Sequence, residues 1–524
     1  MNNVSMLDCT LRDGGYCNLW KFGKNNIEII ISNLIESNVD IVECGFLTKK
    51  GTYDRDASLF HSIAQAESFI KYRKNSNFAL MVNYGEIDID EIPQYNGGFI
   101  DIIRVAFHKK DVSGALEFCK ALCNKGYRVF IQAMVSLSYS DEEFISLINE
   151  VNKFIPYAFY IVDSFGVMKT DTLVHLMDIV DKNINKNIII GFHSHNNMQL
   201  SYSNAQMFCS LADNRNIIVD SSIMGMGRGA GNLNTELFTE YLNDKYGATY
   251  VLKPLLRTID EVINAFHQKN SWGYSLPNYL SAKHNIHPNY ARFLDDKKTL
   301  SFKDVDEIFT FFIEEKKVNY DEEYISRLYL EYMSSNTVSN NIDFLENSLS
   351  GKTVILIAPG KSAEVEKHKI IEMAAKDVKI MTVNHNYNNC DVDYVFISNK
   401  RKATEFVKKE NTILITTSNV SLDYSDIIVD YTQLINNRKY VKDNAGLMAI
   451  KMLIDCGVKK IYLAGFDGYS YDFSENYSQG NESDIYKKSI TDNLNNGMNE
   501  VLAKYSKIID MEFLTTTQYL HINE

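Results

Sequence analysis

The sequence predicts an α/β protein in two parts, an N-terminal (β/α)8 TIM barrel with a helical appendage and a C-terminal open parallel sheet of Rossmann-like form. Three observations support this prediction. The chain has 524 residues, more than one hydrophobic core normally holds. From residue 1 to about residue 250, apolar β-branched runs alternate with amphipathic helical patterns. The same alternation resumes near residue 350 over a length that suits an open sheet.

Eight apolar runs in the first part have the length and composition of strands. They are Ser5 to Asp13, Ile41 to Phe46, Phe78 to Tyr84, Ile100 to His108, Arg128 to Ser136, Ala158 to Phe165, Asn187 to Asn196 and Ile217 to Met224. Segments between them, such as Asn26 to Asn38 and Asp171 to Val180, carry apolar residues at helical spacing. We therefore expect residues 1–250 to form a closed barrel with its chemistry at the carboxyl ends of the strands.

Residues 251–340 are expected to form the helical appendage and a linker, with helical patterns at Leu252 to Gln268 and Asp304 to Met333. The polar run from Ser334 to Asn341 predicts a loop. The second domain is expected at residues 350–524. Its strand-like runs are Thr353 to Ala358, Ile380 to Asn384, Tyr394 to Ser398, Thr412 to Thr416 and Lys460 to Ala464.

Composition excludes several classes of protein. The formal charge of −13, from 54 basic and 67 acidic residues, argues against a nucleic-acid partner and favours a small molecule. The eight cysteines lack CxxC spacing, which predicts reduced thiols. The first strand begins almost at once, leaving no room for a signal segment, and no apolar stretch reaches membrane-spanning length. We expect a cytoplasmic homo-oligomer without a membrane span.

A divalent metal site is predicted where two strand ends meet. Asp13 closes the first run, while His193 and His195 lie two residues apart on the seventh, so that both histidines project from one face. Alternate strands of a barrel contribute to the same interior layer, which lets these side chains converge at its mouth. One carboxylate and two imidazoles leave coordination positions for substrate and water. The alternative interpretation is an inert, hydrogen-bonded pair of histidines.

Polar residues also interrupt strands that are otherwise apolar. They are Glu43, Arg104, Gln132 and Asp163. Buried charge is tolerated mainly when it is paired or used, so we expect these residues to contact the substrate. A structural ion pair between Glu43 and Arg104 is the alternative.

Three motifs in this order resemble the DRE-type TIM-barrel metallolyases, which include 4-hydroxy-2-oxovalerate aldolase, 3-hydroxy-3-methylglutaryl-CoA lyase and isopropylmalate synthase. The motifs are Thr10-Leu11-Arg12-Asp13-Gly14, His193-Ser194-His195-Asn196 and the glycine-rich Gly225 to Asn232. The resemblance covers about the first 290 residues, and the continuation Gly14-Gly15 is similar to the oxovalerate aldolase branch.

The resemblance implies that Asp13, His193 and His195 hold Mn²⁺ or Mg²⁺. It also implies that Arg12 lies against the oxygen that becomes negative in an enolate. The implied reaction joins or separates a pyruvate-type 2-oxo acid and an aldehyde, as in a class II aldolase, without a Schiff-base lysine. A Claisen-type acyl-CoA synthase or lyase on the same barrel is the alternative.

Tyr16 departs from the aldolase pattern, because that branch commonly carries a histidine there as the base for the substrate hydroxyl. A phenol, with an ordinary pKa of about 10, is a poor base near neutrality. We keep Tyr16 and Tyr274 as catalytic candidates. His108 and His287 are further candidates for the proton acceptor.

The C-terminal part contains a turn, Ala358-Pro359-Gly360-Lys361-Ser362, that is not a P-loop because Ile355 stands where a glycine is required. With Asn384-His385-Asn386 and Gly465-Phe466-Asp467, this part resembles bacterial sialyltransferase-like and pterin diphosphokinase-like domains. The resemblance implies contacts to a nucleotide or nucleotide-sugar from Gly360, Ser362, Asn384 and Asp467.

The transferases of this group keep a histidine base downstream, whereas here the only histidine after Asp467 is His521. Binding without transfer is therefore an alternative for this domain, and a non-catalytic nucleotide-sugar-binding protein is an alternative for the whole chain. The pairing of the two domains predicts a role in surface-polysaccharide biosynthesis.

Overall fold

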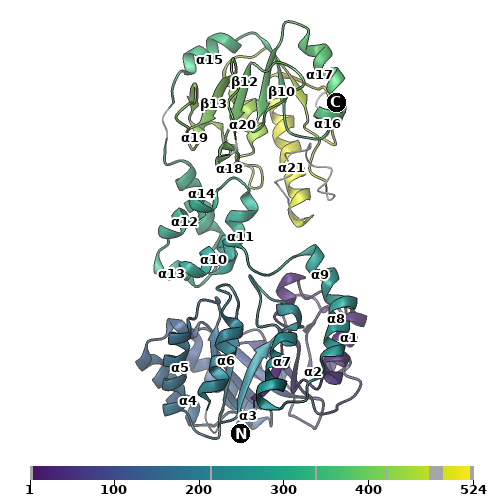
Figure 1. Cartoon of the computed structure of the whole chain (residues 1–524), viewed down its shortest axis with the longest axis vertical. Helices are drawn as coiled ribbons and strands as arrows, with labels where there is room; N and C mark the ends of the chain where they lie inside the picture. Colours follow the sequence, from purple (N-terminus) through teal and green to yellow (C-terminus); the bar gives the residue numbers. More distant parts are fainter. Residues whose placement is uncertain are drawn as a thin grey trace. The chain divides into compact units, whose positions relative to one another are not determined.

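The computed structural model describes residues 4–212, 215–336, 339–404, 406–420, 422–470 and 488–519, so that His521 lies outside the described residues. The chain divides into two compact units (Figure 1). The first is Met1–Ala291 with Lys317–Asn319, and the second is Arg292–Lys316 with Tyr320–Glu524. The segment 251–340, expected as one appendage, is thus shared between the two units.

The first unit is built on a closed barrel of eight parallel strands, as predicted. In barrel order they are β1 (Val4–Asp8), β2 (Ile41–Leu47), β4 (Asn77–Asn83), β5 (Ile100–Phe107), β6 (Arg128–Ala133), β7 (Ala158–Asp163), β8 (Ile189–Ser194) and β9 (Ile217–Ser221). Strand β1 pairs with both β9 and β2, which closes the barrel. A two-residue strand, β3 (Leu59–Phe60), pairs with the carboxyl end of β2.

Helices cover the outside of this barrel, and Figure 1 shows several of them around its wall. They are α1 (Lys24–Glu36), α2 (Ile63–Glu67), α3 (Val112–Asn124), α4 (Asp141–Asn152), α5 (Thr170–Asn183), α6 (Ser201–Leu211) and α7 (Thr235–Tyr246). Because side chains alternate along a strand, one set packs against these helices and the other fills the interior. The inner set includes Leu7, Phe130 and Tyr160. Tyr160 lies against Gly191, where an added Cβ would come 2.3 Å from the tyrosine ring.

The first strand ends five residues earlier than the sequence predicted, at Asp8 instead of Asp13. The carbonyl of Cys9 accepts hydrogen bonds from the backbone N–H groups of Arg12 (3.1 Å) and Asp13 (2.8 Å), and these bonds turn the chain. A short 3-10 helix follows at Gly14–Cys17. The placement of Asp13 on a strand was therefore wrong, because this turn carries both Arg12 and Asp13 beyond the strand end.

The helical region after the barrel is more broken than predicted. The pattern at Leu252 to Gln268 folds as α8 (Leu252–Thr258), a π-helical turn (Ile259–Ile263) and α9 (Asn264–Lys269). The pattern at Asp304 to Met333 folds as α12 (Phe302–Thr310), α13 (Glu314–Lys317) and α14 (Glu322–Met333), and Asp321 caps the last of these through the N–H of Tyr324. The remaining helices of this region are α10 (Leu276–Lys283) and α11 (Pro288–Lys297).

The second unit contains an open sheet of seven parallel strands in the order β14-β13-β12-β11-β10-β15-β16. The five predicted strands are β10 (Thr353–Ile357), β11 (Lys379–Val383), β12 (Tyr394–Ile397), β13 (Ile413–Thr417) and β15 (Lys460–Ala464). The sequence missed β14 (Ile427–Val429) and β16 (Asp510–Phe513), which are edge strands of three and four residues. The strand order reverses between β10 and β15.

Seven helices accompany this sheet in the part of the chain that the structure describes. They are α15 (Ile342–Leu349), α16 (Ser362–Val365), α17 (Lys367–Ala374), α18 (Lys400–Ala403), α19 (Tyr431–Leu434), α20 (Ala445–Asp455) and α21 (Lys488–Tyr505). None of the helices in the described ranges is both long and apolar enough to cross a bilayer. All eight cysteines are free thiols.

Candidate metal centre

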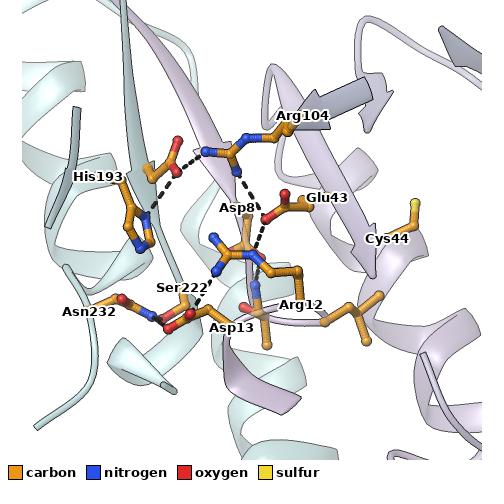
Figure 2. A network of polar contacts seen from close by, with 12 residues as sticks. Asp8, Arg12, Asp13, Glu43, Cys44, Arg104, His193, Ser222 and Asn232 are labelled. Atoms are coloured by element: carbon orange, nitrogen blue, oxygen red, sulfur yellow. Dashed lines mark hydrogen bonds and ion pairs between the residues drawn. The ribbon is translucent and has the colours of Figure 1, made fainter. Parts of the chain in front are cut away.

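Asp13, His193 and His195 come together at the carboxyl ends of β1 and β8, as the sequence predicted. All three are buried, and each offers one ligand atom that lies within 4.8 Å of the other two. His193 lies on β8, whereas His195 follows the strand and is held by an isolated bridge to Asn232. Figure 2 shows His193, Asp13 and Asn232 around one space at this end of the barrel.

The protonation states of this cluster suit a cation. Burial lowers the pKa of His195 to about 3, so its ring is neutral at pH 7 and has a lone pair to offer. Burial alone would raise the pKa of Asp13, but the adjacent His195 ring and Arg12 guanidinium outweigh it and hold that pKa below its usual range. An ionised carboxylate with a neutral imidazole is a donor set that fits a divalent ion.

Asp220, on β9, orients His193 and was missed in the sequence. Its Oδ2 lies 3.0 Å from His193 Nδ1, which leaves Nε2 of the same ring for an ion. Burial opposes ionisation of Asp220, but the guanidinium of Arg104 outweighs it and lowers the pKa of the carboxyl. The available signal was an aspartate on a strand whose neighbouring residues are apolar, the same signal that singled out Arg104.

Asn232 ends the glycine-rich motif but was not predicted as a site residue. Its Nδ2 donates to Asp13 Oδ2 at 2.7 Å, while its Oδ1 is buried and has no hydrogen-bond partner. Gly227 lets this loop approach, because an added Cβ would lie 2.7 Å from Asp13 Oδ2 and 2.3 Å from Asn232 Nδ2. Asn232 therefore offers a further oxygen beside the three predicted ligands.

Arg12 and Arg104 share Glu43 in one buried ionic network (Figure 2). Arg12 donates from Nη1 to Asp13 Oδ1 at 2.7 Å and from Nε to Glu43 Oε2 at 2.8 Å. Arg104 Nη1 lies 3.0 Å from the same oxygen of Glu43, and Nη2 pairs with Asp220. The structure thus contains the ion pair between Glu43 and Arg104, and a contact of either residue with substrate stays a prediction.

Gln132 and Asp163 make hydrogen bonds within the barrel, and their contact with substrate stays a prediction. With its amide oxygen facing Arg104, Gln132 accepts from Nη2 at 3.1 Å and from Nε at 3.3 Å. The carboxylate of Asp163 accepts from the N–H groups of Val167 (3.0 Å) and Met168 (3.1 Å), and burial raises its pKa to about 6. Both oxygens of Asp163 therefore hold the loop between β7 and α5.

The four candidate proton acceptors differ in their contacts and in their exposure to solvent. The ring of Tyr16 lies under the guanidinium of Arg228, at 5.2 Å, three residues after Asp13. His287 Nε2 lies 3.3 Å from Arg228 Nη1, and its ring is 5.8 Å from that of Phe165, which follows β7. Tyr274 is 59% exposed, and within the described residues no hydrogen bond or ion pair joins it to this group. His108 is half-buried, which lowers its pKa.

In the second unit, three of the four predicted nucleotide contacts meet beside the point of strand reversal. Asp467, after β15, accepts from the N–H of Ser362 at 2.7 Å and from its hydroxyl. The N–H of Gly360, after β10, donates to Gly465 O at 3.1 Å, and an added Cβ on Gly360 would lie 2.2 Å from that oxygen. Asn384, after β11, accepts from the N–H of Ser398 at 3.1 Å.

Comparisons with known proteins concern the barrel. The model of the HMGL-like family matches residues 105–283. A 4-hydroxy-2-oxovalerate aldolase of Geobacillus genomosp. 3 is 26% identical over 242 residues, which cover 46% of this chain and 70% of the relative. An oxaloacetate decarboxylase of Mycobacterium tuberculosis is 22% identical over 235 residues, which cover 44% of this chain and 67% of the relative.

A solved structure supports the same fold. The N-terminal domain of a candidate aldolase from Bacteroides vulgatus aligns with a TM-score of 0.51 and 27% identity, covering 58% of this chain and 99% of that one. The family match thus covers the second half of the barrel with His193 and His195, whereas Asp13 lies before the matched residues.

Proposed function

We propose that the barrel is a divalent-metal-dependent carbon–carbon lyase that makes or breaks the bond between C3 and C4 of a 2-oxo acid, with a pyruvate-type enolate and an aldehyde as the two halves. The observation that carries this proposal is the buried set of Asp13, His193 and His195, with Arg12 on the Asp13 carboxylate. The similarity to an aldolase and a decarboxylase named for 2-oxo acids supports the substrate class.

The residues of the mouth suit enolate chemistry. A bound Mn²⁺ or Mg²⁺ supplies positive charge that stabilises the developing enolate. Arg12 adds a fixed charge there, because Glu43 and Asp13 hold its guanidinium in place before the substrate arrives. Asp220 fixes the tautomer of His193, and burial of the cluster keeps the local dielectric constant low.

Proton exchange at C3 of pyruvate tests this proposal without the need to know the aldehyde. The Mn²⁺-loaded protein in D2O is expected to exchange these protons, and Asp13→Asn is expected to abolish the exchange. Asp178→Asn is the matched control, since Asp178 is exposed on α5 and its ion pair among the described residues is with Lys182. Absence of exchange by the loaded wild-type protein would contradict the proposal, and condensation of acetyl-CoA with a 2-oxo acid would favour the Claisen-type alternative.

For the second unit we propose a nucleotide or nucleotide-sugar site at the carboxyl edge between β10 and β15. The supporting observation is the position of Gly360 and Asp467 at the reversal of strand order, where open parallel sheets bind their ligands. A role in cytoplasmic assembly of a surface polysaccharide follows as part of this proposal.

Calorimetric titration with CMP, UMP and CMP-sugars is the test of the second site. Asp467→Ala is expected to abolish binding, whereas Asp455→Ala, which removes an exposed carboxylate paired with Lys451, is expected to leave it intact. No binding of any nucleotide by the wild-type chain would contradict this assignment.

A further inference from the structure

Arg228 differs from the other two arginines of the barrel mouth. Arg12 and Arg104 are each paired with carboxylates. Arg228, from the glycine-rich loop after β9, has no carboxylate partner among the described residues, and its Nε is buried without a hydrogen-bond acceptor. Its neighbours are the ring of Tyr16 at 5.2 Å and His287 Nε2 at 3.3 Å. The Nε–H group of this half-buried guanidinium is therefore a buried donor for which the described residues supply no acceptor.

An unsatisfied, charged donor of this kind is costly, and a guanidinium is built to meet a planar anion. Leaving a buried donor without an acceptor costs its desolvation free energy, and the cost is higher for a charged group. The guanidinium presents parallel N–H groups that match the oxygens of a carboxylate or phosphate. The Tyr16 ring offers the cation a π-face but no acceptor for Nε–H. An anionic ligand group supplies what is missing.

His287 lies against Arg228 and can contribute a second donor at this point. The backbone N–H of Asn289 donates to His287 Nδ1 at 3.2 Å, and Arg228 Nη1 lies 3.3 Å from Nε2. Burial and the charge of Arg228 lower the pKa of His287 to about 3, so the ring is neutral at pH 7 and has a single acceptor nitrogen. One of the two contacts therefore joins two donors. When Nδ1 accepts from Asn289, the Nε2–H group faces Arg228, and an anionic oxygen between them can accept from both.

This group lies beside the metal-ligand cluster and is separate from it. Gly227, which precedes Arg228, is the residue whose added Cβ would lie 2.7 Å from Asp13 Oδ2. Tyr16 follows Asp13 by three residues, and His287 packs on Phe165 at the end of β7. In the proposed function the keto-acid end belongs with Asp13 and Arg12. The group around Arg228 then faces the other half of the substrate.

We propose that Arg228, with His287 and Tyr16, forms an anion subsite at the barrel mouth, and that the aldehyde half of the substrate carries a carboxylate or a phosphate. This inference rests on the proposed aldolase function and specifies its second substrate. A neutral short-chain aldehyde leaves the Arg228 guanidinium unsatisfied, whereas an aldehyde with an anionic end satisfies it.

Addition of pyruvate to matched aldehydes is the experiment. Succinic semialdehyde is compared with butanal, and glyceraldehyde 3-phosphate with glyceraldehyde, so that the carboxylate and the phosphate are tested separately. We expect kcat/KM to be at least tenfold higher for the charged member of at least one pair, chiefly through a lower KM. Arg228→Gln is expected to lower the ratio of kcat/KM for the charged over the neutral aldehyde at least tenfold. Arg228→Lys keeps the charge but loses the parallel N–H groups of the guanidinium, and is expected to give an intermediate ratio.

A binding measurement supports the kinetics if a variant is too weak to assay. Calorimetric titration of the wild-type chain with butyrate and with butanamide is expected to show binding of the carboxylate alone, and Arg228→Gln is expected to lose it. Arg292→Gln, which removes an exposed arginine, is the matched control and is expected to bind as the wild type does.

Equal kcat/KM for charged and neutral aldehydes, or an equal loss for both in Arg228→Gln, would overturn the inference. If the wild-type protein exchanges the C3 protons of pyruvate but shows no preference for a charged aldehyde, the anion subsite is wrong and the aldolase proposal stands. If no exchange occurs, the aldolase proposal fails and the inference fails with it.

Discussion

The two units place polar residues at the carboxyl ends of parallel strands in contrasting ways. The barrel buries full charges there, with Arg12, Glu43, Arg104 and Asp220 in one network beside Asp13. The open sheet has a single carboxylate, Asp467, among small neutral groups: it accepts from the Ser362 hydroxyl, whose oxygen lies 2.7 Å from Thr515 Oγ1. Burying a charge costs desolvation free energy, but a buried charge can stabilise the charge that develops on a reacting substrate. Small groups and glycines instead let a ligand approach the backbone. Under the two proposals, the contrast is between a site organised for chemistry and one organised for binding.

Removal of a predicted metal ligand gives the largest expected effect. Asp13→Asn deletes an ionised oxygen donor, and changes in the shell outside the ligands already cost about 10–100-fold in metal affinity, so a loss of at least about 100-fold is expected. Equilibrium titration with Mn²⁺ measures it. Asp467→Ala is the matching change in the other unit and is expected to leave Mn²⁺ affinity unaltered. Equal losses of Mn²⁺ affinity in the two variants would contradict the assignment of the metal site to the barrel.

Breaking the buried network is expected to give the next effect, on stability. Arg104→Met leaves Glu43 and Asp220 buried without their cation, and loss of one partner of a buried ion pair costs about 3–5 kcal/mol. Urea unfolding followed by circular dichroism measures the free energy of unfolding. A change below about 1 kcal/mol, typical of exposed pairs, would show that the network is not desolvated as described.

A smaller stability effect is expected at the sheet edge. Asp467→Ala removes the acceptor of the Ser362 N–H and hydroxyl, and a buried donor left unsatisfied costs about 1–3 kcal/mol. Ser506→Ala is the control, since its hydroxyl, just after α21, donates to a single carbonyl, that of Ala503. If both variants have the same urea midpoint of unfolding, the hydrogen bonds of Asp467 do not stabilise the fold more than a single exposed hydrogen bond does.

The most local expected change is the pH response of His385 after β11. Its Nδ1–H donates to Val383 O at 3.0 Å, and burial lowers its pKa from 6.5 to about 4. The unfolded chain therefore takes up a proton first, so this residue contributes stability above pH 6.5 that is lost as the pH falls toward 4. NMR of labelled histidine rings, with His385→Gln for assignment, is expected to show this delayed titration. A midpoint near 6.5 would contradict the burial of the ring.

The sequence predicted much of this arrangement for physical reasons that act locally. Apolar, β-branched runs located all eight barrel strands, and the spacing of His193 and His195 implied a shared face. The position of Asp13 was harder to predict. The turn that carries it is made by backbone hydrogen bonds to Cys9 O, which the pattern of side chains does not reveal. The edge strands β14 and β16 were missed because three or four residues do not establish a period.

The partners within the site were harder to predict than its members. Asp220 and Asn232 act through contacts with residues 27 and 219 positions away in the chain, which single-sequence patterns do not register. The isolated polar residue on an apolar strand was a usable signal for Asp220. The role of Arg228 became visible only when its lack of a carboxylate could be compared with the paired Arg12 and Arg104.

The most direct test of the account is pulsed electron paramagnetic resonance of the full-length chain loaded with Mn²⁺ after growth on 15N-histidine. The account predicts one tightly bound ion with nitrogen couplings from two imidazoles, reduced to one coupling in His193→Gln and likewise in His195→Gln. Bound Mn²⁺ without imidazole couplings, or no tight binding at all, would contradict the convergence of Asp13, His193 and His195 on one cation.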